Sequence, residues 1–103
     1  MTTETLEEIV IDEKIEDIIH EPFRYHVVFL NDDKTPMEFV VEILKIIFKH
    51  SQQTAEQIML EVHEKGSSIA GTYSFEIAEQ KTAEATLCAR KQGFPLGIQL
   101  EKA

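Results

Sequence analysis

The chain has 103 residues, which is enough for one domain with a single modest core. Apolar residues make up 43% of it, yet no stretch approaches the roughly 18 apolar residues of a membrane-spanning helix. The formal net charge is −9, so a basic surface that neutralises nucleic-acid phosphates is not expected either. The composition therefore favours a soluble protein that binds neither membranes nor nucleic acid.

Most of the negative charge lies at the start of the chain. Residues 1–21 carry eight acidic side chains and one basic side chain, whereas residues 22–103 carry eleven and nine. Residues 1–21 also contain no aromatic side chain, so we expect a flexible acidic N-terminal extension that ends before Pro22. Whether this extension orders on a partner or only solubilises the chain stays open at this point. Residues 22–103 are expected to form the core domain.

Two features bear on cellular location. The N-terminus lacks the succession of a basic segment, an apolar segment and a small-residue cleavage site, so no secretory signal is expected. The single cysteine, Cys88, has no partner for an intrachain disulfide. Both features predict a reducing, cytoplasmic compartment.

The first predicted strand is Tyr25–Leu30, YHVVFL, which is apolar at almost every position and so should be covered on both faces. A turn then leads into a helix that runs to about His50. Thr35 and Glu38 are expected to form a T-x-x-E capping box, with Pro36 at the first helical position. The apolar residues at helical spacing, which we assign to the core, are Phe39, Val40, Ile43, Leu44, Ile47 and Phe48.

A second capping box begins at Thr54 and predicts another helix, which Gly66 should end. One face of this helix is apolar and carries Ile58, Met59 and Val62. Residues 68–73, SIAGTY, predict the second strand.

Ser74 is expected to cap a third helix that ends near Gln92, because Gly93 and Pro95 follow. The inner face of this helix has mostly small residues and consists of Ile77, Ala78, Thr82, Ala85 and Ala89. The third strand is predicted from the alternation of Leu96, Ile98 and Leu100. The order strand, helix, helix, strand, helix, strand predicts an α/β (α+β) sandwich in which helices cover a three-stranded sheet, and it leaves the strand order open.

Catalytic chemistry finds little support in the residues. The four histidines are scattered without i, i+4 spacing, one cysteine cannot form a thiolate metal site, and no nucleotide-binding or nucleophile motif occurs. Asp32 and Asp33 are adjacent, and neighbouring turn residues usually point apart, whereas the two carboxylates of a hydrolase must converge. We therefore expect a protein that is not an enzyme and that holds no metal or cofactor.

A binding site is better supported, although each of its residues also has an ordinary structural interpretation. Asn31, Asp32 and Asp33 are common turn residues. A lone histidine such as His63 is more often a boundary residue of the core than a ligand group. The apolar residues of the two helices can equally be packing residues between them: Met37, Val40, Met59 and Val62.

Four separated motifs, in order over residues 22–103, together resemble one family. They are NDDKTPMEFV at residues 31–40, the group Met59, Leu60, Val62, His63 and Gly66, the stretch GTYSFEIAEQKTAEA at 71–85, and the ending PLGIQLEKA at 95–103. The family is ClpS, bacterial adaptor proteins that bind N-terminal degrons and hand them to an AAA+ unfoldase-protease. The resemblance implies three antiparallel strands with three helices, which agrees with the element order above.

The resemblance also implies a pocket for the first residue of a substrate chain. Asn31, Asp33 and His63 would surround its free α-amine, with Asp32 adding negative charge nearby. An ammonium group has three donors and no acceptor, so it needs converging acceptors of these types. The cavity for a bulky apolar side chain (Leu, Phe, Tyr or Trp) would be lined by Phe29, Thr35, Met37, Val40, Met59, Val62 and Leu96.

The resemblance extends to selectivity within that pocket. Met37 would act as a gate that clashes with β-branched first residues, so Leu, Phe, Tyr and Trp should be preferred over Ile and Val. Phe29 stands where the family pattern has a smaller aliphatic residue, and Lys34 replaces the usual aromatic after NDD. The preference among the four large residues is therefore the part of the implied function that this sequence leaves undecided.

Delivery would use a second surface. By the same resemblance, Glu76 and Lys81, assisted by Glu79, would contact the N-terminal domain of a ClpA- or ClpC-type unfoldase, and residues 1–21 would also engage it. A solvated helix face is the ordinary alternative for these three side chains. The adaptor is expected to be a monomer.

One alternative belongs to a different class of function. A domain of similar fold occurs in ribosomal proteins that pair with elongation machinery, so the fold by itself would also suit a non-catalytic interaction scaffold, such as a ribosome-associated module. A scaffold would have no need for Asn31, Asp33 and His63 together. These three residues therefore distinguish the two hypotheses.

Overall fold

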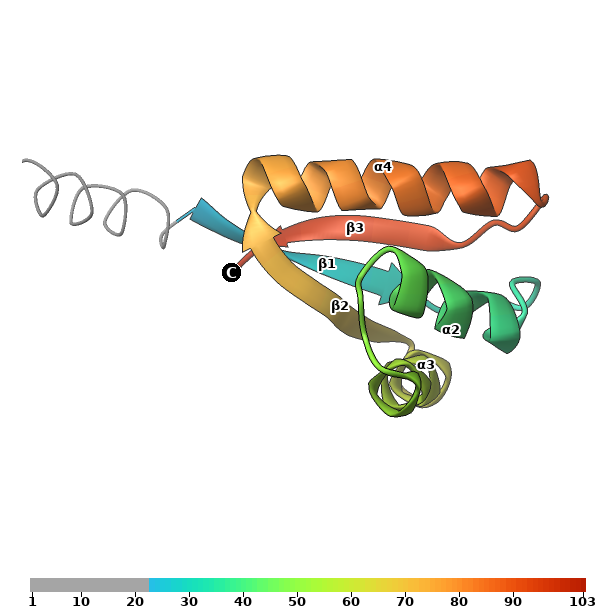
Figure 1. The fold of residues 1–103 in the computed structure, drawn as a ribbon. Helices are drawn as coiled ribbons and strands as arrows, with labels where there is room; N and C mark the ends of the chain where they lie inside the picture. Colours follow the sequence, from blue (N-terminus) through green and yellow to red (C-terminus); the bar gives the residue numbers. More distant parts are fainter. Residues whose placement is uncertain (1–22) are drawn as a thin grey trace, which may run out of the picture.

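The computed structural model describes residues 23–103. Six elements follow one another along the chain (Figure 1): β1 (Arg24–Leu30), α2 (Met37–Ile46), α3 (Gln52–Lys65), β2 (Ser67–Ser74), α4 (Phe75–Lys91) and β3 (Gly97–Lys102). The predicted order of strands and helices is confirmed. The predicted flexible extension at residues 1–21 lies outside the described residues.

The three strands form one antiparallel sheet in the order β2-β1-β3. The predicted three-stranded antiparallel sheet is thus confirmed, and the strand order that the sequence left open places β1 in the centre. Phe29 of β1 pairs with Ser68 on one side and with Ile98 on the other. A register shift in the pairing with β2 falls between Val27 and Val28. The central position explains why three consecutive residues of β1, Val27, Val28 and Phe29, are buried.

The helices share a single apolar core with one face of the sheet. Val27 and Phe29, which alternate onto the same face of β1, belong to this core together with buried residues of all three helices. These helix residues are Val40, Val41, Ile43 and Leu44 of α2, Ala55 and Val62 of α3, and Ala78, Ala85 and Ala89 of α4. No helix within residues 23–103 is long and apolar enough to cross a membrane.

The small residues of α4 allow this helix to lie close to the sheet. Ala78, Ala85 and Ala89 are fully buried, as predicted. Ile77 was also predicted on the inner face, and this is wrong, because its side chain is 43% exposed. An α-helix rotates by about 100° per residue, so a residue next to Ala78 points away from the face that Ala78 occupies.

Both predicted capping boxes are wrong in detail. Helix α2 has Pro36 as its N-cap, and proline has no side-chain acceptor for a capping bond. The Thr35 backbone N–H, which Glu38 would accept in the predicted box, donates to Asp32 Oδ1. Helix α3 begins one turn before Thr54. Its N-cap is Ser51, whose Oγ accepts a hydrogen bond from the Thr54 backbone N–H at 3.2 Å. Ser74 is the N-cap of α4, as predicted, but its side chain makes no capping bond.

The helix ends position the segments that follow. Helix α2 ends at Ile46, earlier than the predicted His50, and the chain then turns through Lys49 in the left-handed region, at φ 61°. Lys81 of α4 donates to the backbone carbonyl of Ile47 at 2.8 Å, just past the end of α2. Gly66 ends α3 as predicted, at φ 91°, where a residue with a Cβ would be strained.

Two serines at helix N-caps provide a matched test of this capping pattern. The variant Ser51→Ala should lower the free energy of unfolding by about 1 kcal/mol, because it removes the acceptor of the Thr54 N–H. Ser74→Ala should change it much less, because the Ser74 side chain makes no capping bond. Urea denaturation of both variants measures the difference, and equal losses would contradict the assignment of the two caps.

Candidate functional site

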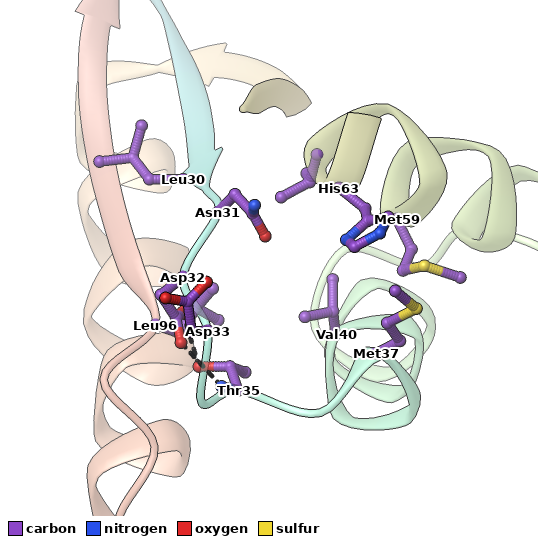
Figure 2. A pocket seen from close by; sticks show the side chains of 11 residues that line it. Leu30, Asn31, Asp32, Asp33, Thr35, Met37, Val40, Met59, His63 and Leu96 are labelled. Carbon is purple, nitrogen blue, oxygen red and sulfur yellow. Dashed lines mark hydrogen bonds between the residues drawn. The ribbon is translucent and has the colours of Figure 1, made fainter. Parts of the chain in front are cut away.

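A cavity of about 240 Å³ opens beside the turn that joins β1 to α2 (Figure 2). Its walls come from the end of β1, the turn, α2, α3 and the residue before β3. The lining residues are Leu30, Asn31, Asp32, Asp33, Thr35, Met37, Val40, Met59, Val62, His63 and Leu96. The structure therefore brings together all the residues predicted for the substrate site except Phe29, and it adds Leu30.

A backbone contact brings the two polar parts of the site together. The backbone N–H of Asn31 donates to the carbonyl oxygen of Gly66 at 2.9 Å. Gly66 is the C-cap of α3, and His63 lies in the last turn of the same helix. The end of α3 is therefore tied directly to the start of the turn, which places the His63 side chain opposite Asn31 and Asp33 (Figure 2).

The turn itself is organised by Asp32. Its Oδ1 accepts hydrogen bonds from the backbone N–H of Lys34 at 2.8 Å and from that of Thr35 at 2.7 Å. Its Oδ2 accepts a third hydrogen bond from the Thr35 hydroxyl at 2.8 Å. The resemblance implies that Asp32 adds negative charge near the amine, and the structure adds that both of its oxygens bond within the turn. Aspartate commonly bonds the backbone after it in turns, and that signal could have revealed this role.

The Asp32 carboxyl is held in its ionised form. Partial burial acts to raise its pKa, but hydrogen bonds from the backbone and hydroxyl of Thr35 and the backbone of Lys34, together with the positive charge of Arg90, outweigh this and lower the pKa. An ionised carboxylate accepts all three hydrogen bonds, whereas a protonated one would lose part of this capacity. The geometry of the turn is thus coupled to the charge of one side chain.

Three other polar side chains lie at the mouth of the cavity. Asn31, Asp33 and His63 are exposed, and none of them bonds through its side chain to another residue of the described part of the chain. In Figure 2 the His63 ring on α3 points toward the side of the cavity where Asn31 lies. A carboxylate, an amide oxygen and an imidazole nitrogen together offer acceptors to a ligand with several donors, such as an ammonium group. No cluster of metal-binding side chains occurs within residues 23–103.

The remaining wall of the cavity is apolar, and its side chains range from buried to exposed. Val40, Val62 and Leu96 are buried, Met59 is half-buried, and Met37 is 43% exposed at the rim. The deep part of the cavity is therefore made by side chains that the core already holds in place. A ligand side chain that enters it would replace water against an apolar surface.

Phe29 does not reach this wall. It is fully buried, and its ring packs edge-on against Phe48 with a centroid distance of 5.4 Å. Leu30, the next residue along β1, is the strand residue that lines the cavity, although its side chain points toward β3 in Figure 2. A Cβ on Gly97 of β3 would come within 3.3 Å of Leu30 Cδ1, so the absence of a side chain at Gly97 leaves room for Leu30.

Comparison with known proteins identifies the family. The model of the family described as ATP-dependent Clp protease adaptor protein ClpS matches residues 20–99. The chain belongs to the ClpS family. Two relatives named ATP-dependent Clp protease adapter protein ClpS are 45% identical in Shewanella pealeana and 46% identical in Shewanella halifaxensis. Each match covers 98% of this chain and 97% of the relative. The chain is therefore an adaptor protein of the Clp protease, as its motifs predicted.

A solved ClpS structure shows the same fold with a small ligand. Agrobacterium tumefaciens ClpS2 bound to L-phenylalaninamide is 40% identical and superposes with a TM-score of 0.77. The match covers 81% of this chain and 100% of that one. Phenylalaninamide presents one free amine and one large apolar side chain, which are the two chemical features that the walls of the cavity described above can accept.

The side chains predicted to face the unfoldase in this ClpS family member lie on α4. Glu76 and Glu79 are exposed. Lys81 is half-buried and engaged within the molecule, because its Nζ donates to the Ile47 carbonyl and lies 5.3 Å from the centre of the Tyr73 ring. An external contact of Lys81 would compete with this internal bond, whereas the two glutamates are open to a partner.

The low pKa of Asp32 predicts a dependence of stability on pH. A carboxyl whose pKa is lower in the folded than in the unfolded chain contributes stability above the unfolded value, and this contribution is lost as the pH falls through the folded value. The ordinary value for Asp32 is 3.8. Asp32→Asn should therefore be less stable than the wild type at neutral pH, and the difference should shrink below about pH 4.

Urea denaturation at a series of pH values between 7 and 3 measures this difference. Asp33→Asn is the matched control. It removes the same charge one residue further along, and the Asp33 side chain makes no bond within residues 23–103. A constant difference between Asp32→Asn and wild type over the whole range would contradict the role of the ionised carboxylate.

Proposed function

We propose that this chain recognises substrates by the first residue of their polypeptide, reading its free α-amine and its bulky apolar side chain, and delivers them to a Clp AAA+ unfoldase-protease. The observation that carries the proposal is that three polar side chains without a side-chain partner among residues 23–103, Asn31, Asp33 and His63, line the same cavity as an apolar wall. The phenylalaninamide bound to the Agrobacterium tumefaciens relative supports it, because that ligand has both features.

The polar mouth suits an ammonium group for a chemical reason. The ammonium has three N–H donors, and the Asp33 carboxylate, the Asn31 amide oxygen and a neutral His63 nitrogen can each accept one. Asp32 would contribute its negative charge from within the turn and no hydrogen bond of its own, because Thr35 and Lys34 already occupy its oxygens. Acetylation of the amine removes its charge and two of its donors.

The apolar wall supplies the second part of the binding energy. Burying a Leu or Phe side chain contributes roughly 1.5–3 kcal/mol, and each hydrogen bond to a charged group contributes a similar amount. The loss of translational and rotational freedom offsets several of these kcal/mol. A dissociation constant of about micromolar or somewhat lower follows, which permits both capture and release.

Met37 would set the preference among first residues. It lies at the rim, at the first position of α2, and is partly exposed. We expect it to clash with side chains that branch at Cβ, so that Leu, Phe, Tyr and Trp bind more tightly than Ile and Val. Because Phe29 does not line the cavity, its size acts on this preference only through the packing behind the wall.

Peptides that differ only at the amine test the proposal. A peptide that begins with Leu or Phe should bind with about micromolar affinity, and its N-acetylated form should bind at least tenfold more weakly, since a charge-assisted hydrogen bond is worth about 1.5 kcal/mol or more. Fluorescence anisotropy or calorimetry measures both, and the same peptides with Ile or Val in first place test the gate. Equal affinity of the free and acetylated peptides would contradict the proposal.

Protein variants locate the binding to this site. Asp33→Ala and His63→Ala should each weaken binding of the Leu peptide without lowering the midpoint of thermal unfolding, because both side chains are exposed and unbonded within residues 23–103. Glu64→Ala is the control, since Glu64 is exposed on the same helix turn but does not line the cavity. Wild-type affinity in both site variants would place the binding elsewhere.

We further propose that a cytoplasmic, monomeric form of this adaptor docks on the N-terminal domain of a ClpA- or ClpC-type unfoldase through Glu76 and Glu79 of α4. Glu76→Lys should abolish binding to the isolated unfoldase domain and leave peptide binding intact. Lys81→Ala should instead lower the stability of the fold, because Lys81 bonds the Ile47 carbonyl. Pull-down with the unfoldase domain measures docking, and thermal unfolding measures stability, so the two effects can be separated. Normal binding of Glu76→Lys to the domain would show that this surface is not the docking site.

A further inference from the structure

The segment between α4 and β3 forms part of the pocket wall without belonging to a helix or strand. We call residues 93–96 the 93–96 loop. Leu96 at its end is 1% exposed and lines the cavity. Pro95 has no backbone N–H to donate. Besides its packing in the core, Leu96 is therefore positioned by a backbone that is held at Pro95 through neighbouring carbonyl groups and not through an N–H.

Arg90, in the last turn of α4, provides such contacts. Its Nη1 donates to the carbonyl oxygen of Phe94 at 2.8 Å and to that of Leu96 at 3.1 Å. These two carbonyls stand on either side of Pro95, so one guanidinium nitrogen fixes the backbone before and after the proline. The Phe94 backbone N–H donates back to Ala89 at 2.9 Å, which closes the loop onto the end of α4.

The loop is also held by an aromatic contact. The Phe94 ring packs edge-on against Phe39 of α2, with a centroid distance of 4.9 Å. Phe39 lies on the helix that carries Met37 and Val40 of the cavity wall. The 93–96 loop therefore contacts both α4 and α2, with Arg90 as its polar attachment.

The charge of Arg90 acts on the turn as well. Burial of Asp32 acts to raise the pKa of that carboxyl, and the positive charge of Arg90 is among the contacts that outweigh the effect of burial. One side chain thus contacts the loop that carries Leu96 and favours the ionised carboxylate that organises the turn. Leu96 and Asp32 both line the same cavity.

We propose that Arg90 is a positioning residue of this pocket: by holding the 93–96 loop on the end of α4 it fixes Leu96 and thereby contributes to affinity and selectivity for large apolar first residues. The expected effect of Arg90 on peptide binding rests on the proposed function. Arg90 itself touches no substrate, and it acts through Leu96 and Asp32.

Three variants test the inference. Arg90→Gln should weaken binding of Leu- and Phe-initiated peptides about fivefold to tenfold, because Leu96 is positioned less well for the ligand side chain once the two hydrogen bonds from the charged donor to its loop are lost. It should also change the ratio between the two affinities, since the residue that moves is on the side-chain wall. Arg90→Lys keeps the charge and one donor, so it should recover part of the affinity.

Lys91→Gln is the matched control. It removes the same charge from the last turn of α4, where both residues lie, and Lys91 is exposed and does not line the cavity. Its affinities should equal those of the wild type. Wild-type affinities and selectivity in Arg90→Gln, or equal losses in Arg90→Gln and Lys91→Gln, would overturn the proposal, whatever happens to the thermal stability.

A measurement without peptide separates this inference from the proposed function. The methyl resonances of Leu96 in the ¹³C-labelled free protein should shift in Arg90→Gln and stay in place in Lys91→Gln. That result supports the positioning role even if no N-terminal residue binds the wild type. Unchanged Leu96 methyl resonances in Arg90→Gln would overturn it even if the peptides bind as proposed.

Discussion

The hydrogen bonds accepted by the Asp32 carboxylate are the contacts on which the site most depends. They close the turn after β1, because one oxygen takes two backbone N–H groups and the other takes the Thr35 hydroxyl. Helix α2 therefore starts at a fixed point and carries Met37 and Val40 to the cavity. The bond from Asn31 to Gly66 then joins the same turn to the end of α3, where His63 lies.

This arrangement separates polar and apolar recognition between different parts of the fold. The polar mouth comes from a turn and a helix end, where side chains are exposed and unpaired within residues 23–103. The apolar wall comes from residues such as Val40, Val62 and Leu96 that belong to the shared core. A pocket whose wall is core packing is preorganised, so little ordering free energy is lost when a ligand side chain enters. The helix α4 takes part through the loop at its C-terminal end and presents Glu76 and Glu79 near its start.

Sequence alone could predict much of this fold because its strongest signals are local. The helical spacing of Phe39, Val40, Ile43, Leu44, Ile47 and Phe48 reflects a real core face, and Gly66 ends α3 where a left-handed residue was expected. The helix starts were harder. Thr35 was a plausible cap, but its N–H and hydroxyl both bond Asp32, and the sequence does not show which of two competing partners wins. At α3 the predicted cap, Thr54, lies inside the helix, and Ser51 is the N-cap; the Ala55 backbone N–H bonds the Ser51 carbonyl oxygen, as this earlier start requires.

The site was predicted mainly through its resemblance to ClpS, and the differences arise where tertiary structure decides. The strand order could not be read from the chain, because two helices separate the first two strands. The resemblance assigned Phe29 to the cavity, but its ring packs against Phe48, and Leu30 is the β1 residue that lines the cavity. Arg90 gave no sequence signal, since an arginine in the last turn of a helix is ordinary. Its importance depends on the carbonyls that it meets in the 93–96 loop.

The most direct test of the central claim is a crystal structure of this chain with L-phenylalaninamide. We expect the ligand amine to lie about 2.7–3.2 Å from acceptor atoms of Asn31, Asp33 and His63. Its benzyl group should enter the cavity beside Val40, Val62 and Leu96, with the Asp32 bonds in the turn unchanged. An amine that faces solvent, or a ligand bound away from this cavity, would contradict the account.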